Sequence, residues 1–199
     1  MSEKSTFFPG DETLAESVLD DQLLTGQDSF IKMHRLTVRL PNGKSSIRDV
    51  IRHPGACAIV ALDSDGKIVL ERQWRAPLNC AFWEIPAGKI DPNEPSLVCA
   101  KRELSEETGL IASRWTFLGT MHNAIGYSDE HIDVYLAEEL SSVQAHLDEN
   151  EFLRLERRHW KDVLEMALSG EISDAKTICA MLWLEHHLRV RNSDGDIED

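Results

Sequence analysis

The sequence predicts one α/β domain, an α/β/α sandwich around a mixed β-sheet, with an extra N-terminal β-hairpin. Short apolar runs of strand type lie both before and after one amphipathic helix, which the spacing of apolar residues places at Ser96 to Leu104. Further helical patterns follow towards the end of the chain, so helices can flank the sheet. The 199 residues suffice for one domain with a good core and one additional element, but hardly for two full domains.

Residues 1–54 are expected to form an N-terminal segment that ends in a β-hairpin. The pattern around Leu14 to Leu24 favours a short helix. Phe30 to Leu40 alternates as a strand does, Pro41 to Lys44 is a hairpin turn of the Asn-Gly type, and Ser45 to Arg52 is the return strand.

Residues 55–191 are expected to hold the main domain. Its strands are predicted at Ala56–Leu62, Lys67–Trp74, Trp115–Met121, Ile132–Ala137 and Glu151–Arg158. Two helices should follow, from Trp160 to Leu168 and from about Asp174 to Val190. The charged residues 192–199 predict a disordered tail.

Composition narrows the class of protein. A formal net charge of −14 argues against nonspecific binding to nucleic acid or anionic membranes, which requires a basic stripe. No run of about 18 apolar residues is present, as a membrane-spanning helix would need, and the N-terminus lacks the apolar core of a signal peptide. The four cysteines have no paired spacing and are expected to be buried free thiols: Cys57, Cys80, Cys99 and Cys179. We therefore expect a cytoplasmic protein.

Three carboxylates lie close together at the end of the central helix, at Glu103, Glu106 and Glu107. Residues three and four apart are neighbours on a helix, so these side chains share one face. Their like charges repel, and a hard divalent cation such as Mg²⁺ would relieve that repulsion because it prefers carboxylate oxygens. Acidic runs on helices are more commonly solvated faces, so the three glutamates alone leave both interpretations open.

A fixed frame surrounds these glutamates, G-x5-E-x7-R-E-U-x-E-E-x-G-U, in which U is an apolar residue. The frame is filled by Gly88, Glu94, Arg102, Glu103, Leu104, Glu106, Glu107, Gly109 and Leu110. If each position matched by chance about one time in ten, the whole frame would arise by coincidence on the order of once in a billion. With the frame complete, the chain resembles a Nudix hydrolase, a family whose fold is the sandwich inferred above.

The frame also has a local physical interpretation. Gly88 and Gly109 lie at the two ends of a loop-helix unit, where glycine permits a positive φ or a close approach of the backbone. Arg102 is expected to pair with one of the carboxylates and hold it in place. Glu94, near the helix start, fits either a contact with the helix dipole or a metal ligand.

The resemblance implies a metal site. In the family, the residues that match Glu103, Glu106 and Glu107 bind the catalytic metals, and Glu106 is expected to be catalytic as well. The backbone carbonyl that matches Ala87 is often a further ligand. The implied cofactor is Mg²⁺, with Mn²⁺ as a substitute.

The resemblance covers about Phe30 to His187 and is closest to ADP-ribose pyrophosphatases. It is carried by Glu71–Pro77, Trp83–Asp91, Gly126–Glu130 and Gly170–Thr177, which related sugar-nucleotide pyrophosphatases share in part. One position departs from the subgroup, since Ile125 stands where a proline is usual.

The resemblance also implies contacts with the substrate. Arg75 matches a phosphate-contacting arginine, and a guanidinium suits bidentate binding of phosphate, whereas Arg72 fits a surface salt bridge equally well. The expected substrate-binding residues are Arg72, Arg75, Glu84, Gly88, Gly126, Ser128 and Glu130. A base that activates water is expected from the loop after the sheet, where Glu149 is preferred and Glu151 is second. An acidic surface loop is the alternative there.

We therefore expect a Mg²⁺-dependent hydrolase that converts ADP-ribose to AMP and ribose 5-phosphate. The alternatives are a pyrophosphatase for another sugar nucleotide, such as GDP-mannose or ADP-glucose, and a non-catalytic sensor of ADP-ribose. In ADP-ribose pyrophosphatases, strands such as the N-terminal hairpin exchange between subunits, so residues 1–54 are expected to make a homodimer.

Overall fold

The computed structural model of the protein describes residues 12–143 and 152–195. The chain forms two compact units. The first consists of Met1–His53 together with Ala124–Asp129, and the second of Pro54–Asn123 together with Glu130–Asp199.

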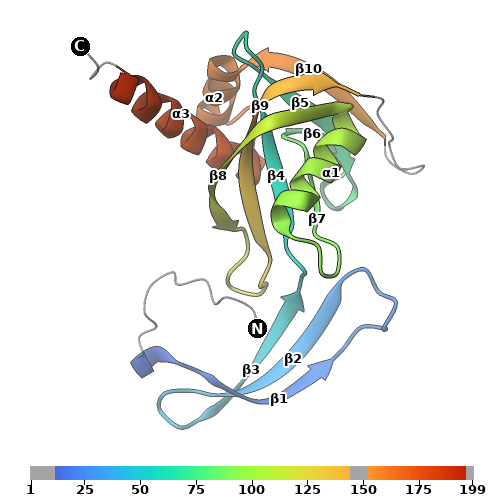
Figure 1. Cartoon of the computed structure of the whole chain (residues 1–199). Coiled ribbons are helices and arrows are strands. Elements are labelled where there is room, and N and C mark those ends of the chain that lie inside the picture. Colours follow the sequence, from blue (N-terminus) through green and yellow to red (C-terminus); the bar gives the residue numbers. More distant parts are fainter. Residues whose placement is uncertain (1–11, 144–151, 196–199) are drawn as a thin grey trace. The chain divides into compact units, whose positions relative to one another are not determined.

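The first unit is a three-stranded antiparallel sheet in the order β1-β2-β3 (Figure 1). A short 3-10 helix, η1 (Glu12–Leu14), precedes β1 (Ser17–Leu23), β2 (Lys32–Arg39) and β3 (Ser45–Arg52). The hairpin and its return strand are confirmed. Gly43 has φ 80° in the turn, a conformation that favours glycine.

The helix expected around Leu14 to Leu24 is wrong. Most of that stretch is β1, whose residues pair with β2 from Ser17 opposite Arg39 to Leu23 opposite His34. A preformed hairpin offers a free edge whose backbone groups bond those of β1, and this partner is distant in sequence. Local periodicity therefore did not reveal it.

The second unit contains two sheets (Figure 1). One has four strands in the order β7-β4-β9-β8, and the other has three in the order β10-β5-β6. The strands are β4 (Ala56–Ala61), β5 (Lys67–Arg75), β6 (Cys80–Glu84), β7 (Ala87–Lys89), β8 (Leu110–His122), β9 (His131–Ser142) and β10 (Leu153–His159). β4 runs parallel to β9 and antiparallel to β7, so the sheet is mixed, as predicted.

Three helices complete the second unit, α1 (Ser96–Thr108), α2 (Trp160–Ser169) and α3 (Ala175–Gly195), with a short 3-10 turn η2 (Ala76–Leu78) after β5. The two faces of β4 show how the helices are layered around the sheet. Its residues Ala58 and Val60 belong to the core cluster that holds side chains of α2 and α3, whereas Cys57 and Ile59 belong to the cluster that holds α1. Because both faces of such a strand are buried, its sequence is a continuous run of apolar residues. The sandwich predicted from the sequence is confirmed.

The C-terminal helix is longer than predicted. Asn192 was expected to begin a disordered tail, but α3 continues to Gly195. Arg191 explains the extension, because its Nη1 donates to Glu138 Oε1 on β9 at 2.8 Å, a contact that composition does not show. Residues 196–199 lie outside the described residues. Within the described part of the chain, no helix combines the length and apolarity needed to cross a membrane.

Candidate metal and phosphate site

The predicted motif folds as a strand, a loop and a helix. β7 pairs with β4, with Gly88 opposite Cys57, and the chain then turns so that Glu94 N donates to Asp91 O at 3.0 Å. α1 follows and ends at Gly109, whose φ of 65° and ψ of 27° are left-handed. Glycine at this position ends the helix without strain, as the sequence indicated.

Gly88 is required for a different reason from Gly109. A Cβ added at Gly88 would lie 1.9 Å from Cδ and 2.0 Å from Oε1 of Glu103. The carboxylate of Glu103 therefore rests directly on the backbone of β7. The motif pairs this glycine with this glutamate because any side chain at position 88 would occupy the place of the carboxylate.

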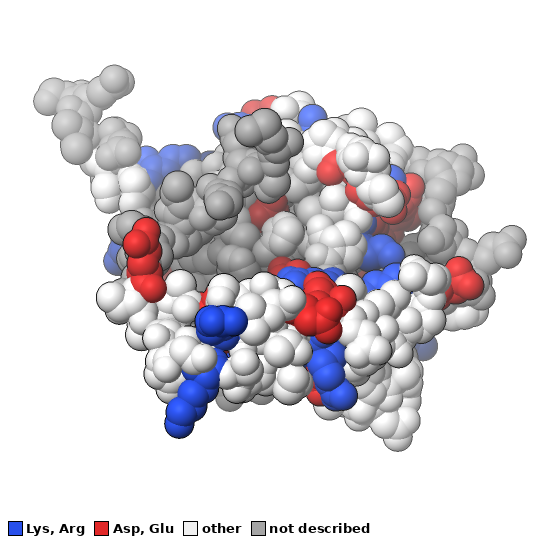
Figure 2. All heavy atoms as spheres, turned by 90° about the horizontal axis from the view of Figure 1, so that it is seen from below, with Lys and Arg blue, Asp and Glu red and all other residues white. Residues whose placement is uncertain are grey.

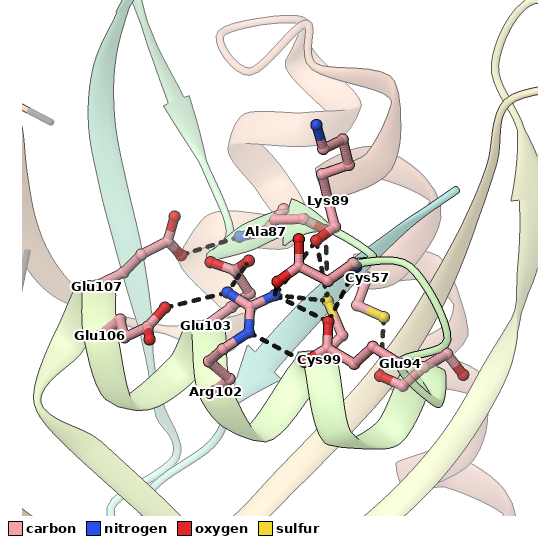
Figure 3. A network of polar contacts seen from close by, with 12 residues as sticks. Cys57, Ala87, Lys89, Glu94, Cys99, Arg102, Glu103, Glu106 and Glu107 are labelled. Atoms are coloured by element: carbon pink, nitrogen blue, oxygen red, sulfur yellow. Dashed lines mark hydrogen bonds and ion pairs between the residues drawn. The ribbon is translucent and has the colours of Figure 1, made fainter. Parts of the chain in front are cut away.

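Arg102 is the centre of the polar network in Figure 3. Its Nη1 donates to Glu103 Oε1 at 2.7 Å and to Glu106 Oε2 at 3.1 Å. Its Nε and Nη2 donate to the two oxygens of Glu94, each at 3.0 Å, and Nη2 also reaches the carbonyl of Lys89 at 3.3 Å. The sequence predicted one carboxylate partner, whereas the structure gives Arg102 hydrogen bonds to three carboxylates. Arg102 thereby connects the loop between β7 and α1 to α1 itself.

Glu94 is a partner of Arg102 in this structure. The N-cap of α1 is Pro95 and no side chain caps the helix. Besides Arg102, Glu94 Oε2 accepts the backbone N–H of Asp91 at 3.1 Å. The hydrogen bonds from Arg102, more than any other cause, lower the pKa of the Glu94 carboxyl from 4.5 to about 2.

The low pKa of Glu94 predicts a specific acid sensitivity. Because the pKa is depressed in the folded protein, the contribution of Glu94 to stability is complete above pH 4.5 and disappears as the pH falls towards about 2. We expect Glu94→Gln to unfold more easily than the wild type at pH 7, and the difference to shrink between those two values. Urea unfolding at a series of pH values measures it. A constant difference over that range would contradict the assignment.

The remaining two glutamates differ in exposure. Glu107 is 4% exposed, and its Oε2 accepts the backbone N–H of Ala87 at 3.2 Å. The side chain of Glu106 is 44% exposed. Both lie with Glu103 on the face of α1 that Figure 3 shows beside Ala87. The predicted metal ligands are thus neighbours in the fold.

The charge of this group fits a cation. Arg102 bonds Glu94, Glu103 and Glu106, and Glu107 lies beside them on the backbone N–H of Ala87, so these five side chains carry three net negative charges. Carboxylate and carbonyl oxygens are the donors that Mg²⁺ prefers. In the described residues, no three acidic, histidine or cysteine side chains already form a metal-binding group. Arg102 explains this, because it holds Glu103 and Glu106, so that a bound ion would exchange those contacts for its own.

A second polar group surrounds Glu84, at the end of β6. Glu84 is 4% exposed, and Arg75 binds it bidentately, with Nε to Oε1 at 2.8 Å and Nη2 to Oε2 at 2.6 Å. Lys176 of α3 donates to the same Oε2. Burial opposes ionisation of Glu84, but the bonds from Arg75 and the charge of Lys176 hold its pKa below the ordinary value. The pKa of Arg75 is raised, chiefly by its bond to Glu84.

Lys176 was missed by sequence reasoning. Its stretch, Gly170–Thr177, was noted as part of the resemblance, but a lysine in a helical pattern gives no sign that it is buried. Lys176 is 8% exposed. Asp174 and Thr177 gave a sequence signal for the start of this helix. An Asp three residues before a Thr is a capping pattern that fixes where a helix begins.

The other predicted residues lie in different places. Arg72 lies over the ring of Trp83, with its Cζ 5.2 Å from the ring centroid. Gly126 and Ser128 belong to the first unit, and Glu130 to the second, where its Oε2 accepts from Asn123 at 2.8 Å. Their part in substrate binding stays a prediction. Glu149 and Glu151, the two candidates for the base, lie outside the described residues.

The cysteines are all free, as predicted, but not all are buried. Cys57 and Cys99 are fully buried beside the motif, where the Sγ of Cys57 donates to Ser96 O at 2.9 Å. Contrary to the prediction, Cys179 is only partly buried and Cys80 is exposed at the start of β6. Its position at the end of a hairpin, after the 3-10 turn η2, leaves it outside both cores.

Comparison with known proteins agrees with this geometry. The family model described as the NUDIX domain matches residues 51–181. The ADP-ribose pyrophosphatase of Bacillus subtilis (strain 168) is 38% identical over 172 residues, which are 85% of this chain and 92% of that protein. The methanol dehydrogenase activator of Bacillus methanolicus is 37% identical over the same shares of the two chains.

A solved structure supports the fold. The crystal structure of an ADP compounds hydrolase superposes with a TM-score of 0.77 at 20% sequence identity, and covers 88% of this chain and 95% of its own. At this identity the likeness concerns the arrangement of helices and strands. The sandwich of the second unit is thus an arrangement already known from an experimental structure.

Proposed function

Because the chain belongs to the Nudix family of hydrolases, we propose that it hydrolyses ADP-ribose to AMP and ribose 5-phosphate. The observation that carries the proposal is the group of three glutamates bonded to Arg102 with Glu107 beside them, which combines a surplus of negative charge with hard oxygen donors. Such a group needs a divalent cation before an anionic diphosphate can approach it. The identity to the B. subtilis enzyme supports the choice of ADP-ribose.

The metal ligands in this proposal are Glu103, Glu106, Glu107 and the carbonyl of Ala87. The cofactor is Mg²⁺, and Mn²⁺ could replace it. When bound, the metal neutralises charge on the phosphates and makes water a better nucleophile. The protein holds the ligands ready: Gly88 gives Glu103 its place and the backbone of Ala87 holds Glu107.

Phosphate binding is assigned to Arg75. Two of its nitrogens are committed to Glu84, yet its side chain is 44% exposed, so the guanidinium can also face a ligand. We assign Glu84 a role through Arg75, since both of its oxygens are engaged by cations. Arg72, Gly126, Ser128 and Glu130 remain the further substrate-binding residues of the proposal.

The water that attacks the phosphoanhydride must lose a proton. We assign this proton to the carboxylate of Glu149, with Glu151 as the second candidate. Water then adds across one P–O bond, and the products are AMP and ribose 5-phosphate.

A substrate panel tests the proposal. ADP-ribose, ADP-glucose, GDP-mannose and NADH are incubated with the protein and Mg²⁺, and the products are separated by chromatography. AMP formed fastest from ADP-ribose would support the proposal. Faster turnover of another compound would identify a different sugar nucleotide as substrate and would connect Ile125 with altered specificity. Tight binding of ADP-ribose without turnover would indicate a sensor.

We also propose a homodimer formed through the first unit. Apolar side chains on its strands are exposed, among them Val18 at 55%, Ile47 at 51% and Met33 at 39%. Some of its charged residues form ion pairs, such as Arg35 with Asp49, whose Nε and Oδ1 lie 2.8 Å apart. Figure 2 shows charged residues in blue and red on a face where uncharged residues, in white, cover much of the surface. Exposed apolar surface of this kind is characteristic of interfaces.

The dimer predicts twice the chain mass of 22.5 kDa in solution. Light scattering at micromolar concentration measures it, and Ile47→Asp should produce a monomer because it places a charge in the interface. Arg39→Asp, which also adds a negative charge on the same unit, serves as the control for the effect of charge alone. A wild-type protein with the mass of one chain would contradict the proposal.

A further inference from the structure

Lys176 has an unusual place for a lysine. It is the one buried lysine or arginine among the residues the structure describes, at 8% exposure. A buried ammonium is unfavourable unless acceptors surround it. Two carboxylates do so, since its Nζ donates to Glu84 Oε2 and lies 3.2 Å from Asp174 Oδ2. Lys176 therefore connects the start of α3 with the end of β6.

The start of α3 is fixed at this point. The backbone N–H and the hydroxyl of Thr177 both donate to Asp174 Oδ2, at 3.0 and 2.6 Å. The same hydroxyl accepts the N–H of Ile85 at 3.0 Å, and Ile85 is the residue after Glu84. Since the helix is fastened to the strand beside Glu84, the ammonium of Lys176 has little freedom to leave the carboxylate.

The charges of this group are balanced. Arg75 and Lys176 carry the positive charges, and Glu84 and Asp174 the negative ones. Without Lys176 the group would carry one net negative charge directly beside the guanidinium of Arg75. Glu107 also lies near enough to contribute to the raised pKa of Arg75. A substrate phosphate would then meet a repulsive environment, because nearby like charges interact strongly in a partly buried site.

We propose that Lys176 is a positioning residue for Arg75: it balances part of the negative charge of Glu84, so that the guanidinium of Arg75 keeps a fixed orientation and has less negative charge beside it when it binds a substrate phosphate. The proposal rests on the role assigned to Arg75 above. It gives Lys176 no contact with the substrate. Its effect passes through Glu84, whose second oxygen it shares with Arg75.

The proposal has a pH signature. Glu84 faces Arg75 and Glu71 from β5 and Lys176 and Asp174 from α3. With Lys176 removed, Arg75 alone opposes the effect of burial, so the pKa of Glu84 rises. Below that pKa the carboxyl is protonated and can no longer accept both bonds from Arg75. The acidic limb of the kcat/KM profile should therefore move to higher pH.

The first experiment compares Lys176→Met with the wild type. We expect KM for ADP-ribose to rise about tenfold with a smaller change in kcat, and the acidic limb to move upwards. Lys176→Gln keeps a hydrogen-bond donor but no charge and should resemble Lys176→Met. Lys176→Arg keeps the charge and should restore most of the affinity. Lys161→Met, an exposed lysine of α2, should change neither quantity.

A purely structural role would give a different result. Leu188→Ala loosens α3 at its other end without removing a charge, since Leu188 is buried in the core. If Lys176→Met only lowers the melting temperature, as Leu188→Ala does, and leaves KM and the pH profile unchanged, the proposal is overturned.

Binding of ADP tests the role of Lys176 independently of the proposed hydrolysis of ADP-ribose. Calorimetry with ADP and Mg²⁺ requires no turnover, so it applies even if ADP-ribose proves not to be the substrate. About tenfold weaker binding by both Lys176→Met and Lys176→Gln, recovered in Lys176→Arg, supports the proposal. Equal binding by all four proteins overturns it.

Discussion

Replacing Gly88 with alanine is expected to leave the fold intact and to lower hydrolysis of ADP-ribose on the order of a hundredfold, the loss that a displacement of about 1 Å at a reacting centre can cause. The new methyl group would coincide with the carboxylate of Glu103, which lies 1.9 Å from the ideal Cβ position. Glu103 can swing away at low cost because its carboxylate is the end of a flexible side chain. The metal would then lose a ligand while the backbone keeps its path.

Two measurements distinguish a loss of stability from a loss of metal binding. Thermal unfolding of Gly88→Ala without metal should resemble that of the wild type, and the Mg²⁺ concentration for half-maximal activity should rise. Gly26→Ala is the control, because its nearest contact would be an ordinary 3.6 Å to Ser29 Oγ.

A double-mutant cycle with Glu103 tests the mechanism of the Gly88 effect. If the methyl group acts by displacing the carboxylate, Gly88→Ala should cost little in a protein that already carries Glu103→Ala. Additive losses would mean that the alanine distorts β7 itself. That outcome would move the explanation from the side chain of Glu103 to the pairing of β7 with β4.

Much of the fold could be predicted because its signals are local. The Asn-Gly turn fixed the hairpin, and the return strand was predicted with the bounds it has, Ser45–Arg52. The short apolar run at Ala56–Leu62 indicated a strand, and the structure shows that β4 is buried on both faces. β1 and the last turn of α3 could not be predicted in this way. Each is held by a partner distant in sequence, β2 for the first and Glu138 for the second.

In the candidate site, too, the features with local sequence signals could be predicted and those that depend on distant contacts could not. Spacing alone placed Glu103, Glu106 and Glu107 on one face, since a helix has a known period. It did not show that Arg102 reaches back to Glu94 across the loop. Lys176 could not be recognised either, because the burial of a lysine depends on strands and helices that meet only in the folded chain.

Glu107→Gln should abolish most of the activity, by about 10³-fold, while the metal-free protein becomes no less stable. The amide can still accept the N–H of Ala87, as Glu107 does at 3.2 Å, so the local structure should persist. One of the like charges on this face of α1 disappears, and this relieves repulsion there. In the proposed site a bound metal would lose one ligand, so it would bind more weakly and be held less firmly in place.

The discriminating measurement is thermal unfolding with and without Mg²⁺. A ligand that binds only the folded protein raises its melting temperature, so the wild type should gain stability from Mg²⁺ and Glu107→Gln should gain much less. Glu165→Gln removes one exposed charge from α2 and should leave the gain unchanged. If Glu107→Gln lost activity but kept the full gain from Mg²⁺, Glu107 would be no metal ligand. Its buried carboxylate would then serve chiefly to hold Ala87, and the surplus charge that attracts the metal would lie in Glu103 and Glu106.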